Sequence, residues 1–328
     1  MSNATVKKGK NLAAQKIFKS YEFSLLIALV LIIAVSALSH KYFLTMTNIM
    51  NIGLTAAVSG TMAAGLTMYM LIGALDVSQY PIAALSTVIM GICNVKLGIN
   101  VWLSLLICLA IGSILGAING SLLLAKIPPV IVTLGTMNVY RGLAYACTNT
   151  RNIILYDNVF KILGQYRIGG IVPVPFLIML LTFALFWFVL NKTKFGRQVY
   201  ATGANPRAAH LAGIPVQKIR FIATTVAGTF AGLAGILSAG QAMAVLPATG
   251  VGSEIDISTA CMVGGLSMGG GKGKIVGCFL GLMILMVINN VLILHSVPSY
   301  WQQVVRGAVL VIAVAIDAVR GGGFNDRG

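Results

Sequence analysis

Charged residues are scarce in this chain of 328 residues, and acids are the scarcest of all. Only 9% of the residues are charged, and seven acids stand against 23 lysines and arginines. A soluble protein of this length would alternate polar and apolar faces, whereas this chain is 58% hydrophobic. The cations gather in short loops rather than along an amphipathic face. Their excess therefore indicates membrane orientation, and we expect no nucleic-acid partner.

Clusters of metal-ligating or catalytic residues are also missing from the sequence. The three histidines lie far apart, and the five cysteines show no C-x-x-C spacing. The segment 269–274 is rich in glycine and lysine, but it lacks the earlier Gly and the following Ser or Thr of a nucleotide-binding P-loop. We therefore expect no metal site, no cofactor bound by this chain and no enzymatic activity of its own.

The chain is instead made of apolar runs of about 20 residues, the length that crosses a membrane. We expect an all-α fold, a polytopic membrane helix bundle of about ten transmembrane helices with both termini cytoplasmic. The first run follows five lysines and could be a signal peptide, but no small-residue cleavage site follows it. The runs near 73–80 and 255–274 are short or Gly-rich and could be re-entrant. The expected spans are 22–39, 49–73, 80–98, 101–124, 129–148, 172–190, 218–241, 255–271, 275–294 and 300–319.

The distribution of cations predicts the orientation, since Lys and Arg accumulate in cytoplasmic loops. With ten spans, sixteen of the 23 cations lie on the side of the N-terminus. The expected organisation is a cytoplasmic tail (1–20), one transmembrane domain (21–320) with a cytoplasmic loop at 192–217, and a cytoplasmic C-terminal tail (321–328).

Glycines spaced four residues apart predict close helix packing, because glycine lets two backbones approach each other in lipid. The spaced glycines are Gly112, Gly116 and Gly120, then Gly228 and Gly232, then Gly277 and Gly281.

The stretch 191–220 holds six cations and no acid, and a short helix is expected inside it. Asn205 suits the N-cap, Pro206 the first helical position and Gly213 the position just past the end. Small side chains with one protruding Arg or His favour docking into a protein groove. A helix resting on lipid headgroups is the alternative, but it would carry Trp, Phe or Leu on one face. The expected docking residues are Asn205, Pro206, Arg207, Ala208, Ala209, His210 and Gly213.

Four segments carry a family resemblance: Asn191–Arg197 with Ala201–Ile214, Pro129–Gly142, Cys261–Gly277 and Tyr300–Gly307. They resemble segments of the ribose-type sugar permeases, the membrane subunits of ATP-binding-cassette (ABC) importers. The resemblance covers about residues 20–320. It implies a permease subunit that carries a monosaccharide, a pentose or hexose, across the bacterial cytoplasmic (inner) membrane. The implied partners are a cytoplasmic ATPase subunit that binds ATP and Mg, an extracytoplasmic sugar-binding protein, a second permease copy or paralogue, and membrane lipid.

Two other functions stay open. The same superfamily includes permeases for nucleosides, quorum-signal sugars and branched-chain amino acids. An ion-coupled secondary transporter would need a buried carboxylate within a span, and Asp76 is the one acid near such a position.

Polar residues inside spans are costly, so they are candidates for the substrate pathway, with interhelical hydrogen bonding as the alternative. The turn that carries Asp76 departs from the family pattern, because Gln79 and Tyr80 replace a small pair. Asp76 could line the pathway or only cap a helix. The candidate pathway residues are Asp76, Gln79, Thr133, Thr136, Asn138, Asn289 and Asn290, and the candidate residues for docking a binding protein are Glu254 and Asp256, which could instead pair with Arg141 and Arg306.

Overall fold

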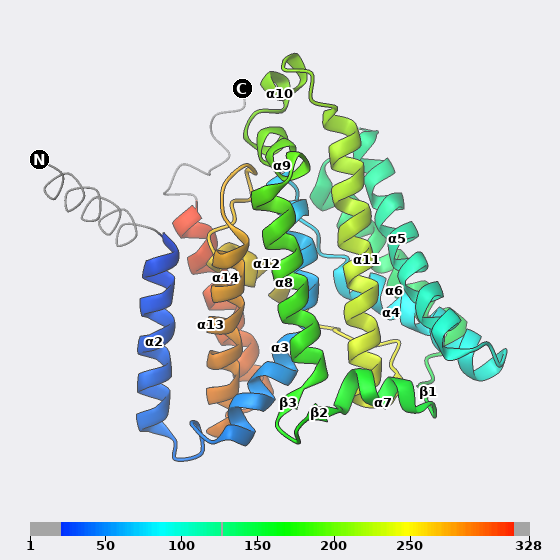
Figure 1. The fold of residues 1–328 in the computed structure, drawn as a ribbon, viewed down its shortest axis with the longest axis vertical. Coiled ribbons are helices and arrows are strands. Elements are labelled where there is room, and N and C mark those ends of the chain that lie inside the picture. Colours follow the sequence, from blue (N-terminus) through cyan, green and yellow to red (C-terminus); the bar gives the residue numbers. More distant parts are fainter. Residues whose placement is uncertain (1–20, 126, 318–328) are drawn as a thin grey trace, which may run out of the picture.

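The computed structural model describes residues 21–125 and 127–317, and it is mostly helical (Figure 1). The first part contains α2 (Tyr21–Ser39), α3 (Met46–Leu71), α4 (Gln79–Gly91) continued by a π-helix, η1 (Ile92–Lys96), α5 (Val101–Leu124) and α6 (Pro129–Thr148). The second contains α7 (Asn158–Gln165), α8 (Val174–Lys192), α9 (Lys194–Ala204), α10 (Pro206–Leu211), α11 (Val216–Ala242), α12 (Asp256–Val263), α13 (Ile275–Leu294) and α14 (Ser299–Asp317). The tails expected at 1–20 and 321–328 lie outside the described residues.

Two small antiparallel pairs of strands fasten the connections. β1 (Ile153–Ile154) pairs with β4 (Ala244–Val245), and β2 (Arg167–Ile168) pairs with β3 (Val172–Pro173). Together with α7, they lie at the end of the bundle opposite α10 (Figure 1).

Seven described helices are long and apolar enough to cross a membrane: α2, α3, α5, α8, α11, α13 and α14. Helix α6 has the bounds expected at 129–148, but it is not among the seven. Helix α4 with η1 covers most of the span expected at 80–98. The span expected at 255–271 is wrong as a full-length helix. Helix α12 has only eight residues, because Gly264 and Gly265 follow it and Gly265 has φ +85°.

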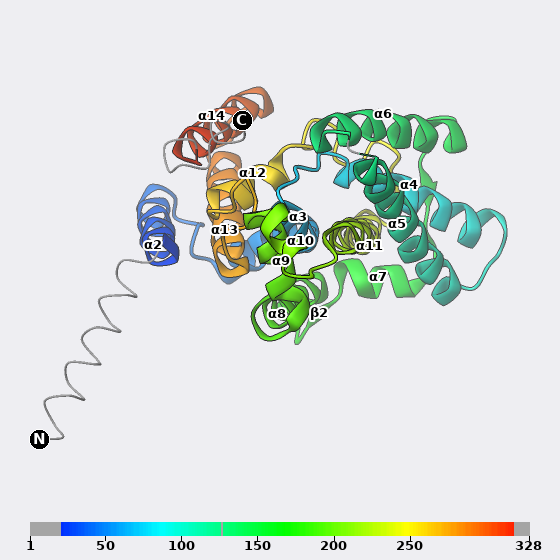
Figure 2. The ribbon, with the colours of Figure 1, turned by 90° about the horizontal axis from the view of Figure 1, so that it is seen from above.

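Helices α3 and α11 hold the bundle together. Helix α11 packs against α3, α4, α5 and α7, while α13 packs against α2, α3 and α12. Seen from above, α4, α5, α6 and α7 form one side, and α2, α12, α13 and α14 form the other (Figure 2).

The spaced glycines lie where two backbones meet, as predicted. A Cβ on Gly112 would lie 2.5 Å from the carbonyl oxygen of Gly228, at the α5–α11 contact. A Cβ on Gly264 would lie 2.5 Å from the carbonyl oxygen of Gly277, beside α13. Such contacts leave no room for any other residue type.

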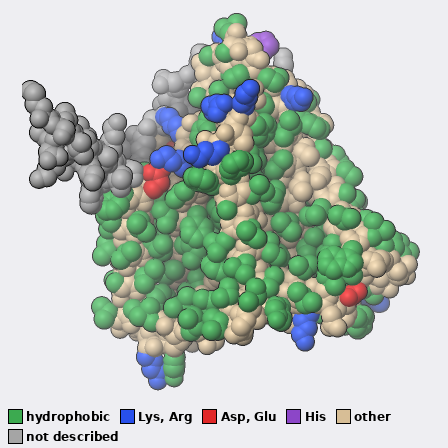
Figure 3. All heavy atoms as spheres, in the orientation of Figure 1, with side chains coloured by type: hydrophobic (Ala, Val, Ile, Leu, Met, Phe, Trp, Pro, Cys, Tyr) green, Lys and Arg blue, Asp and Glu red, His purple; other side chains and the backbone are tan. Residues whose placement is uncertain are grey.

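The outer surface of the bundle is apolar, as expected for helices in contact with lipid. Trp102, Leu181 and Val311 each expose more than half of their surface. Lysines and arginines gather instead around α9 and α10, at one end of the molecule (Figure 3). We call this end the basic end.

Candidate functional site

The expected docking helix is present as α10, and its caps are those that the sequence predicts. The side-chain oxygen of Asn205 accepts the backbone N–H of Ala208 at 3.0 Å, and Pro206 is the first helical residue. The chain leaves the helix through Gly213, whose φ of +79° favours glycine. Helix α10 projects from the basic end of the bundle (Figure 1).

The segment before α10 is also helical, which the sequence reading missed. Helix α9 begins where the Thr193 hydroxyl accepts the N–H of Gly196 at 3.1 Å. Its 11 residues make a second helical element beside α10. The missed signal is this Thr N-cap.

Helix α10 exposes Arg207, Ala208 and His210, while Ala209 is buried. The sequence reading also left out Leu211, which exposes 83% of its surface at the tip. One leucine does not make an apolar face, so α10 fits a protein groove better than a lipid surface.

Helix α9 lies on residues 264–274, which we call the glycine turn. The backbone N–H of Gly271 donates to the carbonyl of Leu71, the last residue of α3, at 2.8 Å. Gly203 of α9 lies against the same two groups. A Cβ at Gly203 would overlap the Leu71 oxygen and lie 2.5 Å from the Gly271 nitrogen. At Gly203, Leu71 and Gly271, the ends of α9 and α3 and the glycine turn therefore meet backbone to backbone.

Side chains fix the glycine turn from three directions. Burial raises the pKa of the Tyr200 phenol, and the nearby Glu22 raises it further, so this hydroxyl stays a donor. The Tyr200 hydroxyl donates to the Gly273 carbonyl at 3.0 Å, and Lys274 forms an ion pair with Glu22 at 2.9 Å. The Ser267 hydroxyl and the Met268 N–H donate to the Asp317 carboxylate at 3.2 and 3.3 Å.

Between α3 and α4 the chain runs through residues 72–78 without regular structure, and we call this segment the embedded turn. The buried Asp76 carboxylate accepts the N–H of Ser78 at 2.7 Å, the Ser78 hydroxyl at 2.6 Å and the Gln79 amide at 2.6 Å. These bonds lie at the first residues of α4, where a carboxylate stabilises the helix start. The N-cap position of α4 is Ser78, so Asp76 is not the N-cap itself but holds that residue in place from two positions earlier. Its role in the pathway stays a prediction.

The Asp76 site also connects four elements. Asn119 of α5 donates to the Ser78 hydroxyl at 2.9 Å, and Tyr140 of α6 donates to Asn119 at 3.0 Å. Ser258 of α12 donates to the Asp76 carbonyl at 3.3 Å. Any movement of the embedded turn therefore affects α5, α6 and α12.

The other expected pathway residues do not form one site. Thr133 donates to the Leu75 carbonyl in the embedded turn at 3.3 Å, and Thr136 lies one turn further along α6. Asn138 is exposed and donates within its own helix. Asn290 and Asn48 exchange two hydrogen bonds of 2.9 Å, which is the interhelical alternative.

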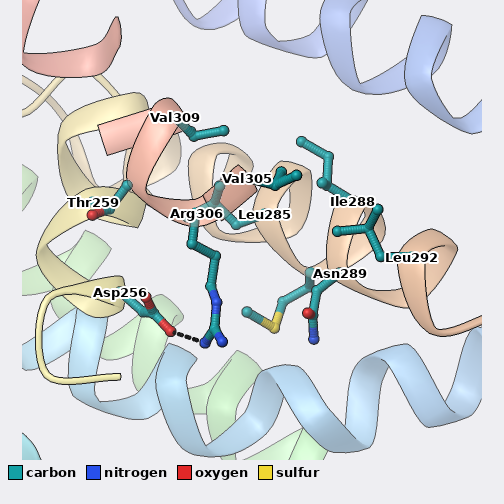
Figure 4. Close-up of a pocket in the computed structure, with 10 residues that line it drawn as sticks. Asp256, Thr259, Leu285, Ile288, Asn289, Leu292, Val305, Arg306 and Val309 are labelled. Carbon is teal, nitrogen blue, oxygen red and sulfur yellow. Dashed lines mark hydrogen bonds and ion pairs between the residues drawn. The ribbon is translucent and has the colours of Figure 1, made fainter. Parts of the chain in front are cut away.

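Asn289 lines a separate, partly open pocket between α12, α13 and α14, with a cavity volume of about 50 Å³ (Figure 4). Its polar groups include Asn289 and the ion pair of Arg306 with Asp256, at 2.7 Å. Most of the lining is apolar: Leu285, Met286, Ile288, Leu292, Val305 and Val309. A cavity of this volume has room for water but is much smaller than the roughly 300–1,000 Å³ of a typical ligand pocket.

Both acids expected to dock a binding protein form ion pairs within the chain. Arg141 pairs with Glu254 at 3.5 Å, and Arg306 pairs with Asp256. These are the partners that the alternative named, and the docking role stays a prediction. Within the described part of the chain, no three His, Cys, Asp or Glu residues are grouped as metal ligands would be.

Comparison with known proteins identifies the family. The profile of a family described as the permease component of branched-chain amino acid transport systems matches residues 48–314. A ribose import permease of Haemophilus influenzae is 35% identical over 89% of this chain and 91% of its own length. The corresponding protein of Bacillus subtilis is 38% identical over 88% and 89%.

An autoinducer 2 import permease of Photorhabdus luminescens is 37% identical over 90% of this chain and 89% of its own. No solved structure matches the chain. The family match spans all the elements described above from α3 to α13 and most of α14. The chain therefore belongs to this family of membrane permease components of transport systems.

Proposed function

We propose that this chain is the permease subunit of an ABC importer and that it carries a monosaccharide, a pentose or hexose, across the bacterial inner membrane. Ribose import permeases that match it nearly end to end support the cargo. The observation that carries the importer mechanism is the rigid, exposed α10, joined to the glycine turn through α9.

The basic end is the cytoplasmic end in this proposal, since cations accumulate on that side. A cytoplasmic ATPase subunit, which binds ATP and Mg, holds α10 in a groove through Arg207, His210 and Leu211. Closure of the ATPases pushes α10 and α9 as one body. With α10 on that side, ten crossings leave both termini in the cytoplasm.

The push reaches the membrane interior through the glycine turn. A Cβ on Gly73, in the embedded turn, would lie 3.2 Å from the Gly269 carbonyl, so the two turns are in contact. The embedded turn then shifts α4 against α5, α6 and α12. Alternating access is the shift between two such arrangements, driven by their different contacts with ATPase and cargo.

Neutral polar groups near the embedded turn favour an uncharged cargo. Thr133, Ser78 and Asn119 are neutral, and Gln79 Oε1 has no hydrogen-bond partner among the described residues. Sugar hydroxyls donate to such acceptors once the turn opens. A second permease copy or paralogue completes the pathway, and Gly135 and Gly142 on α6, which meet no neighbour, leave room for a close helix contact.

The second candidate cargo is a quorum-signal sugar, which the autoinducer 2 relative favours. A branched-chain amino acid, named in the family description, fits less well. Its ammonium and carboxylate need complementary charges, and the described charges near the pocket are already paired with each other.

Uptake by the reconstituted complex tests the proposal. Proteoliposomes with the ATPase subunit, ATP and the binding protein are offered labelled ribose, other pentoses and hexoses, autoinducer 2 and leucine. We expect ATP-dependent uptake of a monosaccharide. Uptake that persists without ATP and collapses with an ion gradient would identify a secondary transporter instead.

Two variants of α10 test its role as a lever. Ala209→Pro removes the N–H that bonds the Asn205 carbonyl at 2.9 Å, and Arg207→Ala removes the protruding cation. Both should lose coupled uptake and remain in the membrane. Arg151→Ala, an exposed arginine at the opposite end, is the control. Normal uptake by the proline variant would contradict the lever.

A further inference from the structure

Residues 246–255, which we call the strap, connect β4 with α12 at the end opposite α10. They contain neither helix nor strand, and Gly250 and Gly252 have positive φ angles of +75° and +81°. The strap passes between α6 and α12 (Figure 2), the zone where the two sides of the bundle face each other.

One arginine fixes the first half of the strap from α6. Nη1 of Arg141 donates to the carbonyls of Pro247 and Thr249 at 2.9 and 2.8 Å, and Nη2 pairs with Glu254 at 3.5 Å. Glu254 also accepts the N–H of Gly252 at 2.8 Å, which closes the turn. A single charged nitrogen therefore holds two carbonyls of the strap, and charge-assisted hydrogen bonds of this kind are stronger than neutral ones.

A second arginine fixes the other end of the strap from α14. Nη1 of Arg306 donates to the Ser253 hydroxyl at 3.2 Å and to Asp256 at 2.7 Å (Figure 4). The Arg306 and Asp256 side chains expose 32% and 26% of their surface, so this pair is reached by water through the adjoining pocket. It can exchange its partners for water at low cost.

The strap lies on the residues that begin α4. Gly250 rests directly on the Tyr80 ring, where a Cβ would overlap the ring carbons. The Tyr80 hydroxyl bonds Ser59 of α3 at 3.1 Å, which keeps the ring in place beside Gln79. Ser258, just after the strap, is 1% exposed and bonds the embedded turn. The strap thus covers the embedded turn from the end opposite the ATPase site.

The two arginines come from opposite sides of the bundle. Helix α6 packs on α4 and α5, whereas α14 packs on α12. Separation of the two sides would therefore break one of the two attachments before the other. Resting on the proposed function, we propose that the strap is the outer gate of the permease and that Arg141 and Arg306 are positioning residues that hold it closed.

Accessibility of a buried thiol tests the gate directly. The full importer complex carries Cys93→Ser and Cys147→Ser, which remove the two cysteines that are not buried, and Ser258→Cys as reporter. A charged, membrane-impermeant methanethiosulfonate is added from the binding-protein side without ATP. Adding Arg141→Gln or Arg306→Gln should speed labelling of the reporter about tenfold, the population shift expected when one charge-assisted contact is lost. Arg151→Gln should leave the rate unchanged.

A paired variant separates a gate from a merely structural ion pair. If Arg306 serves only to neutralise Asp256, the double variant Arg306→Gln/Asp256→Asn removes the unpaired charge and returns labelling to the slow rate. The gate predicts that labelling stays fast, because the attachment is still missing. Slow labelling in the double variant would overturn the proposal.

The buried Cys108 of α5 serves as the internal control for folding. Labelling of Cys108 together with the reporter would show general loosening and would also overturn the gate. The labelling needs no transport, so its outcome is separate from that of the proposed function. A complex that takes up no monosaccharide yet shows the predicted labelling keeps the gate and contradicts the proposed cargo.

Discussion

The substitution Gly203→Ala tests the joint between α9, α3 and the glycine turn. A Cβ at this position would overlap the Leu71 oxygen and lie 2.5 Å from the Gly271 nitrogen, where 3.4 Å is ordinary contact. Both neighbours are backbone atoms and have no rotamer to move away. The joint must therefore open by about 1 Å or more, and overpacking of this kind costs about 1–3 kcal/mol.

The expected result is loss of coupling with the parts still assembled. Helix α10 is unchanged, so the ATPase subunit should still copurify and hydrolyse ATP. The Gly271–Leu71 hydrogen bond of 2.8 Å is what the added methyl group displaces. We expect the number of ATP molecules consumed per sugar imported to rise about tenfold, since 1.4 kcal/mol of lost contact corresponds to a factor of ten.

The assay measures ATP hydrolysis and sugar uptake in the same proteoliposomes. The matched control is Gly307→Ala, on an exposed face of α14 where a Cβ meets no atom within 4 Å. If Gly203→Ala imports sugar with the unmodified ATP cost, the glycine joint is not the route of coupling. Equal uncoupling in the control would point to a general effect of added methyl groups.

Two further substitutions follow from the packing. Asp76→Asn should lower the melting temperature of the complex and slow uptake. One of the three hydrogen-bond donors to the carboxylate would then face the N–H of the new amide, at a cost of about 1–3 kcal/mol. Unchanged stability would mean that the Asp76 site does not hold α4. Gly228→Leu should prevent assembly of the bundle, because the leucine side chain would clash with the backbone of α5. Gly307→Leu, where a Cβ has no neighbour within 4 Å, should be tolerated. Thermal melting in detergent compares the two variants.

Composition and local sequence signals were sufficient to predict many of the helices of this fold. The expected spans at 101–124, 129–148 and 275–294 match α5, α6 and α13 residue for residue. Long apolar runs and flanking turn residues act locally, so one sequence reveals them. The caps of α10 were predictable for the same reason, because an Asn-Pro pair and a following glycine specify a short helix without help from the rest of the chain.

Local sequence signals gave a wrong helix prediction where the chain is apolar but not helical. The run 255–271 has a span's composition, yet glycine with a left-handed backbone ends α12 after eight residues. The glycine turn is stabilised by Leu71, Glu22 and Asp317, which lie far away in the sequence. Hydropathy measures whether a segment can sit in lipid. It does not measure whether the segment has a distant partner.

The polar sites depended most on distant partners. Asp76 was equally consistent with a cap and with a pathway residue, and only the positions of Asn119, Tyr140 and Ser258 show that it also connects helices. Glu254 and Asp256 were read either as a surface for another protein or as partners of two distant arginines. The structure shows that both ion pairs form, and the docking surface stays a prediction.

The two ends of the bundle use different chemistry, and the difference fits their proposed work. At the ATPase end, Gly203, Gly271 and Leu71 meet backbone to backbone, a contact that has no side chain to rotate and so transmits displacement without slack. At the opposite end, Arg306 and Asp256 form a pair that water reaches, which opens and closes at little net cost. A lever has to be stiff and a gate has to be reversible. Consider a permease with the two chemistries exchanged. It would have close backbone contacts at the outer end and a hydrated ion pair at the ATPase end. Such an importer would hydrolyse ATP without opening.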